Sequence, residues 1–236
     1  ISPQPAVPAD PERVLVLGQN SSLQSMLDDL AHYVASGSSV VVASATAPVL
    51  TPPPGLDVEI VSADTTGRAA LDRLDIGGFN HLLVLAYRDT FEEQVADAKT
   101  LVTLLHVRDI ADRQELDLNI VSEIVDDRNR ELAEATQPDD FIVSSRLVSL
   151  MLTQVSENPA LIEVFEELFS GSGSEIYLRP AQHYIAPGAE TDFYAVAAAA
   201  AQRGETAIGF RTAADAHSGA KGYGIHLNPN KSQRQV

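Results

Sequence analysis

Apolar runs and amphipathic stretches alternate along the first 130 or so residues of this 236-residue chain, and this order limits the folds open to it. The runs are short, nearly free of polar residues and bounded by loop-forming residues, as expected of strands buried on both faces. They are Arg13–Leu17, Ser39–Ala43, Val58–Val61, His81–Ala86 and Asn119–Val125. Segments with helical spacing lie between them, over Leu23–Val34, Arg68–Leu74 and Phe91–Leu105. We therefore predict an α/β fold, a Rossmann-like doubly wound parallel sheet with helices on both faces.

The pattern changes after residue 140. A short strand, Asp140–Val143, leads into two predicted helices, Arg146–Val155 and one that begins at Asn158-Pro159. Further elements predict a small α+β subdomain: strands over Glu175–Arg179, Thr206–Arg211 and Tyr223–Leu227, and a helix over Thr191–Arg203. The predicted organisation is a linker at 1–12, a Rossmann-like lobe at 13–144, a pair of crossover helices that dimerise the chain at 145–170, and a C-terminal subdomain at 171–236, entered through a hinge at Gly171–Gly173.

Composition narrows the function classes. A formal net charge of -17 argues against nucleic acid and anionic membrane as partners. A divalent cation is a more natural partner, and the alternative is that the acidity only keeps the protein soluble. Without cysteine there is no disulfide and no thiolate metal site. No apolar run is long enough to span a membrane, so we expect this segment to be cytosolic and not inserted. The chain begins at Ile1 rather than Met and is proline-rich there, which leads us to expect a piece of a longer protein.

The turn after the first strand is where a Rossmann-like fold holds a nucleotide. Here Gly18 is followed by Gln19 and Asn20, whose side chains occupy positions at which glycines let the backbone approach a pyrophosphate. The second strand ends in Ala43-Ser44, without the carboxylate that holds a ribose hydroxyl. Gly18, Gln19 and Asn20 are therefore the candidate cofactor-binding residues by position, but the sequence argues against NAD or ATP as the cofactor.

Acidic residues follow two neighbouring strands. Asp89 and Glu92 come after the fourth predicted strand, and Glu123 lies near the end of the fifth. Parallel strands end at the same edge of the sheet, so these carboxylates are expected to face one crevice. Calcium prefers six to eight oxygen ligands, which makes Asp89, Glu92 and Glu123 a candidate metal site with Ca²⁺ as the cofactor. The alternative is a solvated acidic rim in which Asp89 caps the following helix.

No catalytic arrangement is visible. The six histidines are scattered without ligand spacing, and no Gly-x-Ser-x-Gly elbow is present. We assign no catalytic residue and do not expect an enzyme. The helix pair after residue 145 is rich in apolar residues, which either pack on the parent sheet or pair with a second copy of the chain.

Three stretches resemble the cytosolic part of the CASTOR/POLLUX (DMI1-like) ion channels. They are Asn119–Asp127, Asp140–Leu150 and Ile162–Phe169, and the tail around Ile208–Arg211 and Asn228-Pro229 is also similar. The resemblance covers about residues 13 to 230. It implies a TrkA-N-like regulatory (RCK) domain that forms a dimer and then a gating ring below the pore of a cation channel. The channel would be related to potassium or calcium transport, and its transmembrane pore is expected upstream of this chain.

In calcium-gated relatives, acidic residues after the fourth and fifth strands form the metal site, and Asp89 and Glu123 match those places. Arg88 and Val125 depart from the pattern, since neither is a good calcium ligand. Two alternatives stay open. One is a soluble TrkA-like nucleotide-binding subunit of a potassium transporter, and the other is a Rossmann-fold oxidoreductase, which the missing glycines and the missing ribose carboxylate disfavour.

Overall fold

A computed structural model describes residues 10–129, 132–133, 140–169, 176–186, 188, 190–215, 219–230 and 234–235. The chain forms two compact units, Val7–Glu175 and a smaller one made of Ile176–Val236 with Ile1–Ala6. Each unit is described by itself below. Most of the predicted linker at 1–12 and the predicted hinge at Gly171–Gly173 lie outside the described residues.

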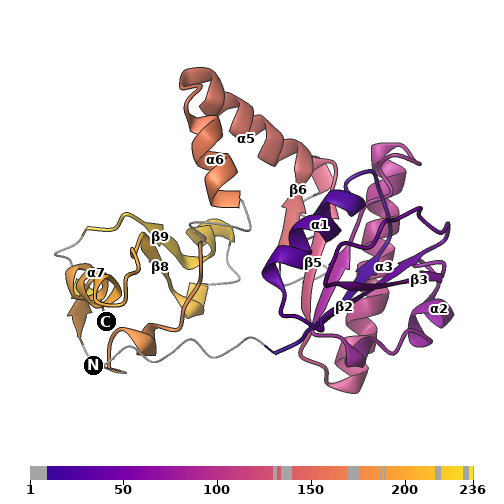
Figure 1. Ribbon diagram of the computed structural model, residues 1–236, viewed down its shortest axis with the longest axis horizontal. Coiled ribbons are helices and arrows are strands. Elements are labelled where there is room, and N and C mark those ends of the chain that lie inside the picture. Colours follow the sequence, from indigo (N-terminus) through magenta and orange to yellow (C-terminus); the bar gives the residue numbers. More distant parts are fainter. Residues whose placement is uncertain are drawn as a thin grey trace. The chain divides into compact units, whose positions relative to one another are not determined.

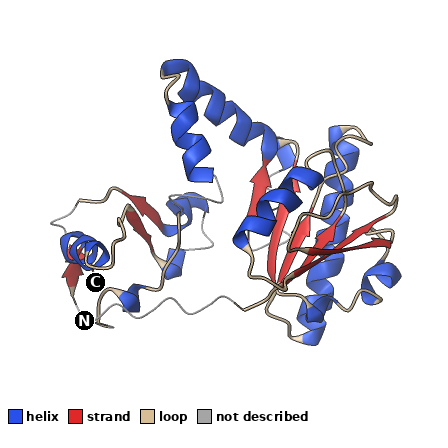
Figure 2. Ribbon diagram, in the orientation of Figure 1, coloured by secondary structure: helices blue, strands red, loops and turns tan. Residues whose placement is uncertain are grey.

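The large unit is built on a six-stranded sheet with the order β3-β2-β1-β4-β5-β6 (Figures 1 and 2). All of its strand pairs are parallel, as predicted. The strands are β1 (Arg13–Leu17), β2 (Ser39–Ser44), β3 (Asp57–Ser62), β4 (His81–Val84), β5 (Asn119–Ile124) and β6 (Asp140–Val143). The order reverses between β1 and β4, the point at which Rossmann-like sheets open a crevice beyond the strand ends.

Helices cover both faces of this sheet, as predicted. On one face, α2 (Arg68–Asp72) and α3 (Glu93–Gln114) pack on the side chains that alternate strand residues present to them. On the other face, α1 (Leu23–Tyr33) packs on β1 and β2 through Leu23 and Leu27. The central strand β1 is buried from Val14 to Leu17, which explains why its sequence is continuously apolar.

The face that α1 covers is open beyond β1. Leu83 and Val121 are half-buried on β4 and β5, and Ile142 on β6 is 48% exposed. A cleft of about 160 Å³ lies over these strand ends, beside Asn20, Ser22 and Glu123. The open face and its cleft therefore adjoin the crevice at which the site residues were predicted.

A buried carboxylate on α3 fixes the turn after β5. Asp97 is fully buried, and its two oxygens accept hydrogen bonds from the backbone nitrogens of Val125 and Asp126, at 2.8 and 3.0 Å. It also accepts a bond from the Asn129 side-chain amide at 2.7 Å. Buried backbone donors need an acceptor, so Asp97 takes the place of a β-ladder partner for the Val125 and Asp126 nitrogens at the end of the sheet.

Two helices follow the sheet without a loop. Helix α5 (Ser144–Glu157) begins at the residue after β6, and α6 (Leu161–Phe169) turns back beside it (Figure 1). The hydroxyl of Tyr33, at the end of α1, donates to the carbonyl of Phe169 at 3.1 Å. All residues of both helices are described, and none of their side chains is buried. The predicted helix pair therefore exists, and its apolar residues are exposed or half-buried.

The small unit holds α7 (Phe193–Ala201), the antiparallel pair β8 (Gly209–Arg211) and β9 (Ile225–Leu227), and the short pair β7 (Thr191–Asp192) and β10 (Arg234–Gln235). Phe193 and Phe210 pack at 6.3 Å, and His226 stacks on Phe210 at 4.7 Å between ring centroids. An α+β subdomain was predicted. The strand predicted over Glu175–Arg179 is wrong in its described part, because Ile176–Arg179 forms neither a strand nor a helix.

Several boundaries also differ from the predictions: for example, the helix predicted over Thr191–Arg203 is Phe193–Ala201, and the strand predicted over Thr206–Arg211 is Gly209–Arg211. β4 ends at Val84, because Leu85 and Ala86 already belong to the turn that leads to the crevice. α3 begins at Glu93, two residues after Phe91, whose ring lies 4.9 Å from the Lys99 ammonium. None of the helices formed by the described residues is both long and apolar enough to cross a membrane.

We predict that Asp97→Ala lowers the free energy of unfolding by about 3 kcal/mol, because it leaves the backbone nitrogens of Val125 and Asp126 without an acceptor. Urea unfolding followed by circular dichroism measures this change. Asp112→Ala, which removes an exposed carboxylate from the same helix, is the control and should change stability by less than about 0.5 kcal/mol. Equal losses for the two variants would contradict the role of Asp97.

Candidate functional site

Glu123, near the end of β5, is the centre of the crevice. Its Oε2 accepts a hydrogen bond from the Asn20 amide at 2.7 Å and one from the Ala86 backbone nitrogen at 3.3 Å. Its Oε1 accepts from the Nη1 of Arg88. The side chain is only 12% exposed. One carboxylate therefore joins the turn after β1, the turn after β4 and the end of β5.

Arg88 and Asn20 extend this network to the start of α1. The Nη2 of Arg88 donates to the Ser22 hydroxyl, and the Asn20 amide also donates to the Ala86 carbonyl at 3.0 Å. The Asn20 Oδ1 accepts from the Ser22 backbone nitrogen at 3.0 Å, which closes an Asx turn before the helix. Asn20 was predicted to crowd a phosphate, and its observed role is to hold Glu123 and to shape this turn.

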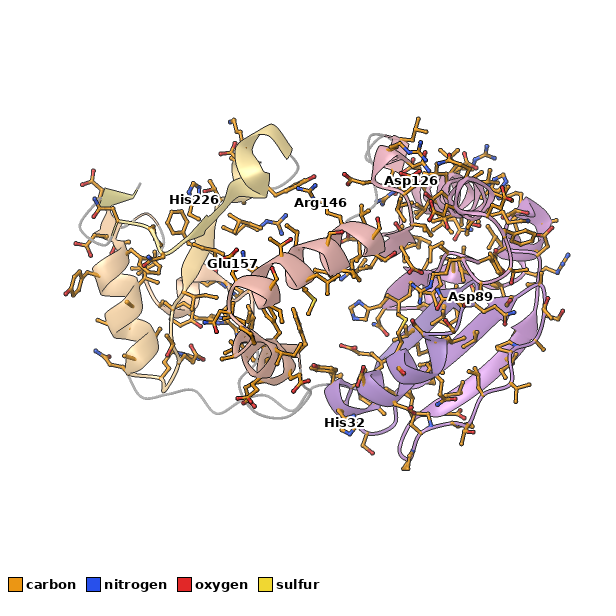
Figure 3. The ribbon with its side chains drawn as sticks, turned by 90° about the horizontal axis from the view of Figure 1, so that it is seen from above. His32, Asp89, Asp126, Arg146, Glu157 and His226 are labelled. Atoms are coloured by element: carbon orange, nitrogen blue, oxygen red, sulfur yellow. The ribbon has the colours of Figure 1, made fainter. Side chains whose placement is uncertain are left out.

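The carboxylate of Asp89 lies at the start of α1. Its Oδ2 accepts a hydrogen bond from the Ser21 backbone nitrogen. Figure 3 labels Asp89 beside this helix and Asp126 in the turn after β5. The alternative in which Asp89 caps the helix after β4 is not what the structure shows, because Asp89 binds the turn before α1. A negative group therefore already occupies part of the position at which a helix start attracts phosphate.

Glu92 stands apart from the other two predicted metal ligands. It is the exposed residue before α3, and its side chain makes no capping hydrogen bond. Glu123 is bound by Arg88, and Asp89 is bound by a backbone nitrogen. Among the described residues, no three histidine or acidic side chains converge as they would around a metal ion. As they stand, Asp89, Glu92 and Glu123 do not fit a calcium ion, and the cation site stays a prediction.

Gly18 packs against Leu85, in the turn after β4, rather than leaving room for a ligand. Its φ is +101°, and a Cβ atom there would lie 2.4 Å from the Leu85 carbonyl oxygen. The Gln19 side-chain oxygen is buried without a hydrogen-bond partner. At the end of β2, the Ser44 hydroxyl is likewise buried and unpartnered, and it is no carboxylate for a ribose. The residues present do not fit a dinucleotide.

A second network follows β5 and was not predicted. Arg128 donates to both oxygens of Asp126 at 3.1 and 2.8 Å, and these bonds hold the pKa of Asp126 below its ordinary value. The Ser145 hydroxyl donates to the Val125 carbonyl at 2.8 Å, and Arg146 pairs with Asp127 at 3.6 Å. The turn after β5 is therefore bound both to α3 and to the first turn of α5. Only long-range contacts reveal this, and a single sequence carries no signal for them.

We predict that Glu123→Ala lowers the free energy of unfolding by about 3 kcal/mol, because it leaves the Ala86 nitrogen and the Arg88 guanidinium without their acceptor. A double-mutant cycle of Arg88→Ala and Glu123→Ala should give a coupling energy of about 1 kcal/mol or more. Arg113→Ala, which breaks an exposed pair with Asp109 on α3, is the control and should cost far less. Additive effects of Arg88→Ala and Glu123→Ala in urea unfolding would show that the two side chains do not interact.

Comparison with known proteins gives relatives but no match to a family model. The chain is 32% identical over 174 residues to the ion channel CASTOR of Lotus japonicus, which covers 62% of this chain and 20% of the relative. It is 30% identical over 251 residues to the ion channel POLLUX of the same plant, which covers 89% of this chain and 27% of the relative. The chain spans less than a third of these relatives' length.

A solved structure shares the fold. The human SLO3 gating ring superposes with a TM-score of 0.54, over 95% of this chain and 42% of the other, at 12% sequence identity. At that identity the likeness concerns the fold alone. The named relatives are ion channels rather than enzymes. By sequence, the chain is similar over most of its length to one segment of the CASTOR and POLLUX ion channels.

Proposed function

We propose that this chain is the regulatory domain of a cation channel, a ring-forming unit on the cytosolic side that passes a ligand signal to a pore outside this segment. The observation that carries the proposal is the match to channel sequences over up to 89% of the chain. The likeness in fold to a gating ring supports it. We expect no catalysis, since the relatives named are channels and the crevice residues are engaged with one another.

The helix pair α5–α6 supports self-assembly. Helices of 14 and 9 residues are marginal in water unless an apolar face is covered. Leu152 is 65% exposed and Phe169 is 60% exposed. Phe165 stacks on Phe169 at 6.3 Å between ring centroids, so the two rings form one apolar surface at the end of α6. If two copies of the chain paired through this surface, the Phe165 and Phe169 rings of each copy would be covered by the other copy.

The ligand signal would reach the pore through a shift in the populations of two relative orientations of paired domains. A ligand in the crevice changes the relative orientation of paired domains only to the extent that it binds one orientation better than the other. The turn after β5 supports this mechanism within the large unit, because Val125 is bound both to Asp97 on α3 and to Ser145 on α5. A change in the crevice therefore has a direct structural route to the helix pair.

We predict that the chain sediments as a dimer or larger at micromolar concentration, and that Phe165→Asp with Phe169→Asp gives a folded monomer, because charge on the apolar surface prevents pairing. Analytical ultracentrifugation, with circular dichroism to check folding, measures this. Val49→Asp is the matched control, since Val49 is a fully exposed apolar residue in the loop after β2. A wild-type chain that stays monomeric at every concentration would rule out assembly through α5–α6.

A further inference from the structure

We infer that a second cleft, beside α1, is a binding site for a small hydrophobic amine, a molecule with an apolar body and one ammonium group. The apolar body lies against the part of the sheet that α1 leaves open, and the ammonium binds Asp29 at the rim. The inference adds a ligand site to the domain proposed above, separate from the crevice at the strand ends. It rests on that proposal only for the link to a pore.

The cleft has a volume of about 240 Å³ and lies between α1 and the open face of the sheet. Its lining is almost wholly apolar and comes from three elements: Leu23, Met26, Leu27 and Leu30 on α1, Val16 on β1 and Leu83 on β4. An apolar cavity of about 150 Å³ is large enough to bind benzene. The cleft beside α1 therefore has room for a six-membered ring with a short chain attached to it.

Asp29 gives this cleft its polar end. Among the described residues that line the cleft, Asp29 alone carries a charge. It is exposed and lies on the same edge of α1 as Met26 and Tyr33, three residues before it and four residues after it. Within the part of the chain that the structure describes, no residue forms a hydrogen bond or an ion pair with the Asp29 carboxylate. An ammonium group at the rim therefore meets an acceptor that the protein has not used.

Charge selects the amine over other apolar molecules. The formal net charge of -17 attracts a cation and repels a carboxylate or a phosphate. Contact with Asp29 adds a charge-assisted hydrogen bond to the burial of the apolar body, whereas a neutral alcohol of the same shape gains little beyond burial. A second copy that covered the cleft with apolar side chains would leave Asp29 unpaired. The amine is the occupant that matches both the lining and the rim.

Tyr33 connects this cleft to the helix pair. It lines the cleft, and its hydroxyl donates to the Phe169 carbonyl at the end of α6, at 3.1 Å. A ligand that packs on Tyr33 therefore changes the surroundings of this hydrogen bond. The site has a route to α5–α6 that does not pass through Glu123 and the turn after β5.

The test uses the 236-residue chain and three probes of similar shape, namely phenethylamine, phenethyl alcohol and phenylacetate. At neutral pH they are positive, neutral and negative. Titrations followed by amide NMR shifts give both the dissociation constants and the place of binding. We expect the amine to bind with a dissociation constant of about 1 to 10 mM, as its size allows. It should bind about threefold to tenfold more tightly than the alcohol, and phenylacetate should bind more weakly than either.

Asp29→Asn should remove the preference for the amine over the alcohol and leave the binding of the alcohol unchanged. Asp28→Asn is the matched control, because it removes the same charge from the adjacent residue of α1. The Asp28 carboxylate does not line the cleft and accepts a hydrogen bond from the Gln24 amide at 2.9 Å. Asp28→Asn should therefore keep the preference for the amine.

Tyr33→Phe tests the connection to α6. This variant keeps the ring that lines the cleft and removes the hydroxyl that holds the Phe169 carbonyl. In the wild-type chain the Phe169 amide signal should move as the amine binds. In Tyr33→Phe the amine should still bind within about twofold of its wild-type affinity, and the Phe169 signal should no longer follow it.

Three results would overturn the inference. The first is an amine that binds the wild-type chain no more tightly than the alcohol does. The second is an equal loss of preference in Asp28→Asn and Asp29→Asn, which would reduce the effect to general charge. The third is amine binding that weakens as the chain concentration rises, which would mean that a second copy covers the cleft. A chain that dimerises through α5–α6 without binding the amine keeps the proposed function and loses this inference, and a monomer that binds it through Asp29 does the reverse.

Discussion

A parallel sheet has to be covered on both faces, and the rest of the large unit depends on how this chain meets that requirement. Helix α3, at 22 residues, covers one face across the central strands. On the other face α1 packs mainly on β1 and β2, which leaves β4 to β6 partly open. The crevice, its cleft and the exposed helix pair all lie in the large unit, where cover by its own helices is incomplete.

Polar contacts take over where apolar packing stops. At the strand ends, Glu123 and Asp97 each accept hydrogen bonds from backbone nitrogens that no strand partner reaches. An unpaired buried donor costs as much as a lost hydrogen bond, so each carboxylate stabilises the turn that it holds. The acidic composition of the chain thus has a structural use at this edge, in addition to any effect on solubility.

The sequence predicted the sheet well and the site poorly, for different physical reasons. Strand β1 matches its predicted range because a buried strand has a local apolar signature. Parallel topology predicts that β4 and β5 end at the same edge of the sheet. This shared edge is what brings Arg88 and Glu123 together. The identity of the partners does not follow, because 35 residues separate these two side chains and periodicity describes only neighbours. Arg88 was regarded as a poor calcium ligand, and in the structure it forms an ion pair with Glu123.

The connection between β6 and α5 contains no loop residue, since one ends at Val143 and the other begins at Ser144. A strand and a helix joined in this way turn together, and Ser145 and Arg146 fasten the joint to the end of β5. Fourteen residues of helix extend about 21 Å from that joint. A rotation of about 5° at the sheet edge would therefore move the far end of α5 by about 2 Å. Helix α5 therefore amplifies a change of a few degrees in the turn after β5. The resulting displacement at the far end of the helix is as large as the helix shifts seen when subunit interfaces rearrange.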